Sequence, residues 1–371
     1  SFTLSQTGMV RHWLKVRREG AQDARGWLRS LVINAIGAIA TFVVLIVVID
    51  TKFLAGAWIV IAAMPVIIAG FYAIHRHYLA VQRLIRSGTV PITATPTSHV
   101  VLYVEDVNPA MVEALGYIRG FCARTGFRAV HVGAGPEATD LASRWRSLSR
   151  TDVELELLPG GHPSKAVIEY IRTIPREPGD FVTVVIPETY ERRSLLAAIR
   201  NRDTFLLKLR LLSEPGVVIT DVPVVKGERE VKTIPVLPLR TVALVFVSGV
   251  HDATERAVNY ARSLQASESR AVYFALDPTE IELVQREWQR RNIQMELDIV
   301  EAPFRDLGPP MLEEVRRVTA QPDSIAAVVI AEIVPQKWWH AILHRQRPLY
   351  IKRLLLFEPR VILSSVPYHL K

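Results

Sequence analysis

Polar residues and glycines stand at the ends of two consecutive apolar segments, and their types suit the binding of a nucleotide. Asp106 and Asn108 follow the segment VVLYV, and His131, Gly133 and Gly135 end the next segment, FRAVHVG. Glycine lets backbone amides approach an anion closely, and the N-terminus of a following helix favours phosphate. The sequence therefore predicts a nucleotide site at these five residues. The alternative is that they are ordinary turn and helix-capping residues.

Catalytic chemistry has no comparable support in the sequence. No P-loop and no GxGxxG joins a strand to a helix, and no GxSxG elbow or catalytic triad has suitable spacing. The single cysteine, Cys122, excludes internal disulfides, and no Cys/His cluster has metal-ligand spacing. We expect a protein that is not an enzyme and has no metal site.

The elements that must position these residues alternate between strands and helices. Apolar runs predict strands at 100–107, 127–133, 153–158, 181–186 and 217–220. Helical spacing predicts helices at about 109–125, 164–173 and 192–212. This order is typical of a parallel sheet with helices on both faces, which binds ligands at the carboxyl ends of its strands.

The alternating pattern occurs twice. Residues 199–223 align without gaps to residues 343–367, so that Glu214 and Pro215 match Glu358 and Pro359. The sequence predicts two tandem copies of one α/β domain, packed as a pseudo-dimer. The copies span 97–223 and 241–371, with a linker at 224–240. The second copy has fewer glycines at its first turn and is expected to be mainly scaffold.

Two long apolar runs precede this domain pair, at about 31–49 and 53–74. About 20 apolar residues in a helix cover a hydrocarbon core of about 30 Å. Residues 30–86 are therefore predicted to form a transmembrane helical hairpin that turns at residues 50–52. The preceding segment, 1–29, contains the amphipathic stretch MVRHWLKVRR and is expected to lie at the interface with the lipid bilayer.

Basic residues flank the hairpin on both sides, whereas its turn offers only Lys52. The positive-inside rule puts both ends of the hairpin, and the whole domain pair, in the cytoplasm of a multi-pass cell-membrane protein. Residues 1–90 carry a net charge of +7, whereas residues 91–371 are close to neutral at +1. The basic excess therefore faces lipid headgroups, and the footprint of a nucleic-acid binder is missing.

Several stretches resemble a known family. The segments SFTLSQTGMVRHWL, INAIGAIAT, KFLAGAW and IHRHYLAV resemble the end of the membrane domain of APC-superfamily permeases. The branch is that of KUP-like potassium importers of the KimA type, often labelled amino-acid permeases. The C-terminal stretch ILHRQRPLYIKRLLLFEPRVILSSVPYHL is similar to the end of their cytoplasmic tail.

The chain opens on Ser1 and is expected to be a fragment. The resemblance implies further membrane helices upstream, with which the hairpin would pack. It also implies a tail like the universal stress proteins, regulation by cyclic di-AMP and a homodimer formed through the tails. The sequence departs from ATP-binding stress proteins, because PETYERR and AEIVPQKWW follow the fourth strands where a phosphate loop is expected. The family's transport site lies in helices that this sequence does not contain.

The leading hypothesis is a C-terminal part of a secondary transporter, a proton-coupled potassium symporter whose tail is a regulatory domain. An amino-acid permease of the same superfamily is the alternative on substrate. A membrane-tethered nucleotide sensor without transport is the alternative on class.

Overall fold

The computed structural model describes residues 2–19, 27–53, 58–85, 96–122, 126–149, 153–190, 202–225, 240–302, 304, 306–321, 323–334, 346–355 and 358–370. The chain divides into two compact units, Ser1–Ala80 and Val81–Lys371. The first unit is helical, and the second is built around a β-sheet.

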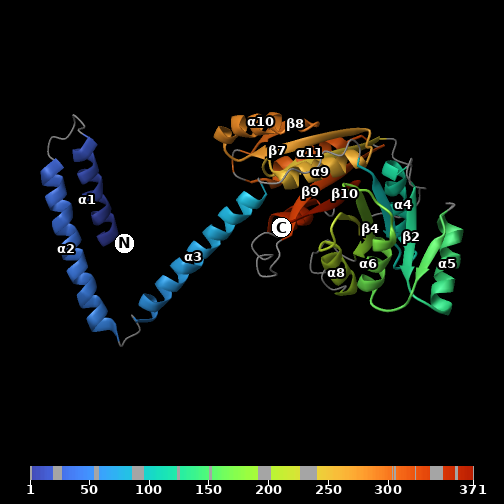
Figure 1. The fold of residues 1–371 in the computed structure, drawn as a ribbon, viewed down its shortest axis with the longest axis horizontal. Coiled ribbons are helices and arrows are strands. Elements are labelled where there is room, and N and C mark those ends of the chain that lie inside the picture. The colour runs from blue at the N-terminus through green and yellow to red at the C-terminus, as the bar shows by residue number, and fades with distance from the viewer. Residues whose placement is uncertain are drawn as a thin grey trace. The chain divides into compact units, whose positions relative to one another are not determined.

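Two packed helices, α1 (Phe2–Glu19) and α2 (Trp27–Lys52), form most of the first unit (Figure 1). The hydroxyl group of Thr3 donates a hydrogen bond to that of Thr41, 3.1 Å away, where the two helices meet. The amphipathic stretch identified in the sequence is thus the second half of a longer helix.

One helix of the described chain is long and apolar enough to cross a membrane. It is the segment Leu28–Val48 of α2, with a mean hydropathy of 2.8, and it agrees with the first predicted span, 31–49. The tight turn predicted at residues 50–52 is wrong, because α2 continues through them. The hydroxyl group of Thr51 donates to the carbonyl of Val47 at 2.8 Å. This polar side chain is therefore satisfied within the helix and requires no turn.

The second predicted span, 53–74, is helical from Trp58 onward, its residues 54–57 lie outside the described part of the chain, and the described part contains no second candidate span. Its helix, α3 (Trp58–Leu84), contains Pro65 and continues into the polar stretch HRHYLAVQRL. The described residues therefore offer one membrane span where the sequence predicted two.

Ten strands of the described chain form one sheet, in the order β3-β2-β1-β4-β5-β10-β9-β6-β7-β8. The strands are β1 (Ser98–Tyr103), β2 (Phe127–Val132), β3 (Leu155–Leu158), β4 (Phe181–Tyr190), β5 (Val217–Val225), β6 (Arg240–Val247), β7 (Glu268–Ala275), β8 (Glu296–Glu301), β9 (Ser324–Val334) and β10 (Val361–His369). All neighbours are parallel except β5 and β10, which run antiparallel with Thr220 opposite Ser364. The order is the same when read inward from either edge. The expected α/β class with a mostly parallel sheet is confirmed.

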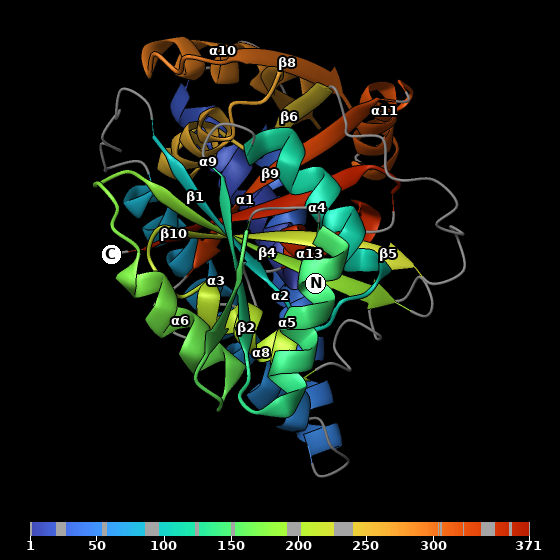
Figure 2. The same ribbon diagram turned by 90° about the vertical axis from the view of Figure 1, so that its right-hand side faces the viewer.

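Helices cover both faces of this twisted sheet (Figure 2). They are α4 (Pro109–Cys122), α5 (Pro136–Ser149), α6 (Pro163–Thr173), α8 (Arg202–Leu211), α9 (Asp252–Ser263), α10 (Ile281–Arg290), α11 (Gly308–Thr319) and α13 (Gln346–Leu355), with a 3-10 turn η2 (Pro278–Glu280) before α10. On one face, α4, α5, α9 and α10 share a single apolar core that spans both halves of the sheet. On the other face, α6 and α8 form one core, and α11 and α13 form another. The shared core makes the two halves one folded body.

A row of buried hydroxyl groups also connects the halves. Ser98 lies 2.6 Å from Thr183, which donates to the phenol of Tyr260 at 3.2 Å. The Tyr260 phenol donates to Ser364 at 3.4 Å, and Ser364 lies 2.8 Å from Thr220. Tyr260 belongs to α9 of the second half, yet it reaches β4 of the first half. Each polar group in this row is satisfied by the next, as buried polar groups must be.

The predicted element boundaries agree with the structure to within a few residues where both are described. The strand predicted at 100–107 corresponds to β1, which begins two residues before the predicted start and ends at Tyr103. The helix predicted at 164–173 corresponds to α6. The basic helix predicted at 192–212 is described only from Arg202. Residues 191–201, and most of the predicted linker 224–240, lie outside the described part of the chain.

Candidate functional site

A hollow lies at the carboxyl ends of β1 and β2, beside the N-terminal half of α5. It has a volume of about 590 Å³, within the range of ligand pockets. Its lining consists of Glu105, Asp106, His131, Pro136, Glu137, Asp140, Leu141 and Arg144. The fold thus brings two of the five predicted site residues, Asp106 and His131, to one place, because parallel strands end at the same edge of the sheet.

Asp106 is held by an arginine of α5. The Arg144 guanidinium donates to Asp106 Oδ1 at 3.1 Å and to Asp140 Oδ2 at 3.0 Å. His131 is held by a different contact. Its Nδ1 lies 2.7 Å from the carbonyl oxygen of Val104, which fixes the plane of the ring. The arrangement offers carboxylate oxygens and the imidazole ring of His131 to the hollow.

Asn108 does not line the hollow. Its side-chain oxygen accepts a hydrogen bond from the backbone N–H of Met111 at 3.1 Å, and it therefore caps the start of α4. This contact supports the alternative, helix-capping interpretation for this residue.

The two predicted glycines shape the turn between β2 and α5. The Gly133 N–H already donates to the carbonyl of Leu158 at 3.2 Å. A β-carbon at Gly133 would lie 2.6 Å from Nε2 of His131, so no larger residue fits without displacing the ring. Gly135 has a φ of +89°, a conformation that favours glycine. Their contribution to ligand binding stays a prediction.

The hollow is strongly acidic. Glu105, Asp106, Glu137 and Asp140 bring four carboxylates, and Arg144 is the one arginine in the lining. Burial, followed by the nearby carboxylates of Glu105 and Asp203, raises the pKa of Tyr103 at the end of β1 to about 12. Such a lining accepts hydrogen bonds from hydroxyl or amino groups more readily than it holds a phosphate.

A second polar cluster, which the sequence did not reveal as a site, lies at the carboxyl ends of the central strands. Lys208 of α8 places its ammonium group 2.6 Å from Asp221 Oδ1 and 2.9 Å from Glu188 Oε2. The Asp221 side chain is 6% exposed and that of Glu188 is 13% exposed. The cluster is therefore a buried ionic network.

The two pKa shifts in this cluster show that attraction overcomes burial. Burial alone lowers the pKa of Lys208. The charges of Asp221 and Glu188 raise this pKa by more than burial lowers it, so the net shift is upward. Burial alone raises the pKa of Asp221, but the charges of Lys208 and Lys352 lower it, and the net shift is downward. Both groups are held in their charged forms.

The second half of the sheet repeats half of this cluster. Lys352 lies 3.3 Å from Glu332, whose side chain is 5% exposed, and Ser365 stands where the first half has Asp221. The hydroxyl group of Ser365 is buried and has no hydrogen-bond partner among the described residues. The signal was present in the sequence, because each of these lysines and glutamates matches its counterpart at the spacing of the internal repeat.

The last turn of α3 packs against the second half of the sheet. Val81 and Ile85 are buried beside Leu370, which follows β10. The carbonyl oxygen of Ile85 accepts a hydrogen bond from the backbone N–H of Asp252 at 3.0 Å. Asp252 is the first residue of α9, so α3 contacts the carboxyl end of this half of the sheet.

Asp252 is itself tightly held. Its side chain is completely buried, and Arg291 donates to its Oδ1 at 2.7 Å while Tyr368 donates to its Oδ2 at 3.4 Å. Arg291 also donates to Glu255 at 2.6 Å. Burial lowers the pKa of Arg291, but the two carboxylates raise it, and the net shift is upward.

Among the described residues, no group of three or more His, Cys, Asp or Glu side chains has the geometry to hold a metal ion.

Comparison with known proteins identifies the family. The family described as the KimA potassium transporter C-terminal domain matches residues 97–224 and again residues 239–368. The chain belongs to this family.

A curated relative supports this assignment. Potassium transporter KimA of Bacillus subtilis (strain 168) is 28% identical over 228 residues, which cover 60% of this chain. The chain spans about a third of the length of this relative, since the match covers 36% of it. The family is one of transporters, which agrees with the prediction that the chain is not an enzyme. Together with the apolar helix α2, it indicates a membrane protein.

Proposed function

We propose that this chain is the C-terminal part of a proton-coupled potassium uptake transporter and that its sheet is a cytoplasmic regulatory domain. The KimA family and the name of its Bacillus relative support potassium as the substrate. The basic residues that flank α2 and α3 support a cytoplasmic position for the sheet. Transport residues would lie in parts of the protein that precede this chain.

The observation that carries the regulatory role is the docking of α3 on the sheet. The hydrogen bond from Asp252 to Ile85 and the cluster of Val81, Ile85 and Leu370 attach the end of a partly apolar helix to the carboxyl edge of β6, β9 and β10. A ligand that binds the sheet better in one arrangement of α3 than in another shifts the equilibrium between those arrangements by the difference in binding free energy. Couplings of this kind typically amount to about 1–3 kcal/mol.

Cyclic di-AMP is the ligand that we propose for the acidic hollow of the first half. The carboxylates of Asp106 and Asp140 can accept hydrogen bonds from ribose hydroxyls or from an adenine amino group, as acidic residues do in dinucleotide sites. Arg144 supplies one positive group for a phosphate. We further propose that the two halves are universal-stress-protein-like copies and that the tails form a homodimer, with the lipid bilayer and upstream helices as the other partners.

The test uses the complete protein in a bacterial strain that lacks its own potassium uptake. Growth at low potassium, restored by the protein and reduced when cyclic di-AMP rises, is the expected result. Asp106→Ala should relieve the inhibition, whereas Glu169→Ala, an exposed carboxylate on α6, should leave it unchanged.

Three other outcomes would redirect the assignment. Uptake of labelled amino acids without potassium uptake would favour the permease alternative. Binding of cyclic di-AMP without any transport would favour a membrane-tethered sensor. Potassium uptake that ignores cyclic di-AMP would overturn the ligand assignment and keep the substrate.

A further inference from the structure

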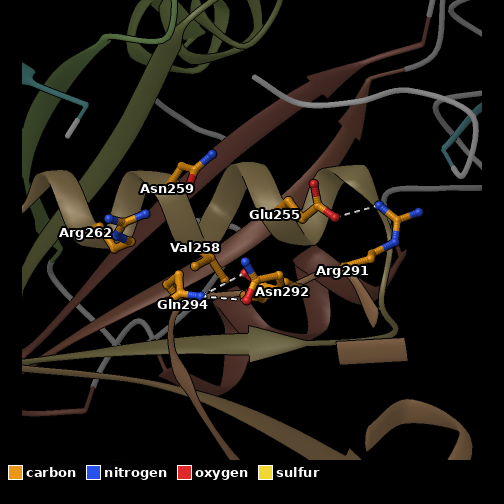
Figure 3. Close-up of a pocket in the computed structure, with 8 residues that line it drawn as sticks. Glu255, Val258, Asn259, Arg262, Arg291, Asn292 and Gln294 are labelled. Atoms are coloured by element: carbon orange, nitrogen blue, oxygen red, sulfur yellow. Dashed lines mark hydrogen bonds and ion pairs between the residues drawn. The ribbon is translucent and has the colours of Figure 1, made fainter. Parts of the chain in front are cut away.

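A small pocket lies between α9 and the turn that leads from α10 to β8 (Figure 3). Four residues of α9 line it at helical spacing, so they share one face of the helix. The lining consists of Glu255, Val258, Asn259, Arg262, Arg291, Asn292, Ile293 and Gln294. We propose that this pocket binds an oxyanion of the phosphate class.

The charge of the lining favours an anion. Arg291 is paired with Glu255 and with Asp252 through one terminal nitrogen, and its Nε is buried without a hydrogen-bond partner among the described residues. The side chain of Arg262 makes no hydrogen bond or ion pair with any described residue. An arginine fork matches two oxygens of a phosphate and is more weakly hydrated than an ammonium group.

Amide groups beside the arginines add neutral donors. Gln294 donates to the side-chain oxygen of Asn292 at 2.8 Å, which orients both amides across the pocket from Asn259 and Arg262 (Figure 3). The lining therefore has two guanidinium groups, three amides and one carboxylate. The acidic hollow of the first half, with four carboxylates, has the opposite balance.

The size of the pocket limits what can enter. Its interior is about 30 Å³, room for about two water molecules. A single phosphoryl group can insert an oxygen or two between Arg262 and Gln294 while the rest of the ligand stays in solvent. A buried nucleotide does not fit.

The pocket is connected to α3 through Arg291. An anion near its guanidinium competes with Glu255 and Asp252 for that charge, and Asp252 holds the carbonyl of Ile85 through its backbone N–H. Binding should therefore loosen the attachment of α3. This consequence for transport rests on the proposed function, whereas the binding itself does not.

The test is isothermal titration calorimetry of the full chain in phosphatidylcholine nanodiscs, with inorganic phosphate and with sulfate. We expect millimolar binding of both ions. Arg262→Gln should weaken it by about tenfold or more, because hydrogen bonds to charged groups are among the stronger ones. Arg290→Gln is the matched control, since Arg290 is exposed on α10, pairs with Glu287 and does not line the pocket.

Equal affinities in the Arg262→Gln and Arg290→Gln proteins, or no binding by the unaltered chain, would overturn the proposal. Repeating the titration with phosphatidylglycerol in the nanodiscs identifies the source of the anion. Weaker phosphate binding there means that lipid headgroups occupy the pocket, and unchanged binding means that a soluble phosphate does. Phosphate binding with no effect on potassium uptake would keep the site and remove its link to transport.

Discussion

Replacing Lys208 by methionine should strongly destabilise the sheet unit. Methionine keeps the apolar stem and removes the ammonium group that lies 2.6 Å from Asp221 and 2.9 Å from Glu188, two buried carboxylates. Breaking a buried ion pair in this way costs about 3–5 kcal/mol. At about 2–4 °C per kcal/mol for a domain of this size class, the unfolding midpoint should fall by roughly 6 °C or more.

The second half of the sheet supplies the comparison. Lys352→Met should cost less, because Lys352 forms an ion pair with one carboxylate at 3.3 Å, whereas Lys208 forms ion pairs with two, at 2.6 and 2.9 Å. Asp221→Ser copies the residue found at the matching position, Ser365, and retains the pair of Lys208 with Glu188. It should therefore be milder than Lys208→Met.

The assay is thermal unfolding of the full chain in detergent, followed by tryptophan fluorescence, because Trp145 and Trp288 are buried in the shared core of the sheet. The expected order of midpoints is unaltered chain, Asp221→Ser, then Lys208→Met. A Lys208→Met midpoint within about 1 °C of the unaltered chain would refute the reasoning, since it would mean that the two carboxylates are solvated or protonated without cost.

Three further changes test other parts of the structure. Gly133→Ala should lower the free energy of unfolding by about 1–3 kcal/mol, because its methyl group displaces the ring of His131. An unchanged unfolding midpoint would contradict this contact. Ile85→Asp puts a charge into the cluster that holds α3, and hydrogen exchange at the Asp252 amide should accelerate; an equally slow amide would show that the contact is dispensable. Burial lowers the pKa of His369, so the unfolded chain binds this proton more tightly, and stability should fall as the pH drops below about 6.5; His369→Gln should flatten that part of the curve, and an identical curve would refute the assignment.

The sheet was predictable because its signal is local and repeated. Runs such as FVTVVI and TVALVFV are apolar throughout, as strands covered on both faces must be. The alternation with helices then fixed the parallel arrangement. The same logic placed Asp106 and His131 close together, since both follow predicted strands that end at one edge.

Helix ends and membrane spans were less predictable. The charges at residues 50–52 indicated a turn, but Thr51 satisfies its hydroxyl group within the helix and α2 continues. Asn108 was expected in the site, but its side chain caps α4. A polar residue after a strand can serve either purpose, and only the position of the neighbouring N–H groups decides between them.

By itself the sequence determined the class of fold, the repeated order of its elements and one apolar helix, because hydrophobic periodicity and the repeat are properties of the chain. Only the tertiary structure decided that Lys208, Asp221 and Glu188 form one buried cluster, that Tyr260 joins the two halves, and that Ile85 is bonded to Asp252. These contacts join residues far apart in the sequence. Their energies depend on distance and burial, which no local pattern encodes.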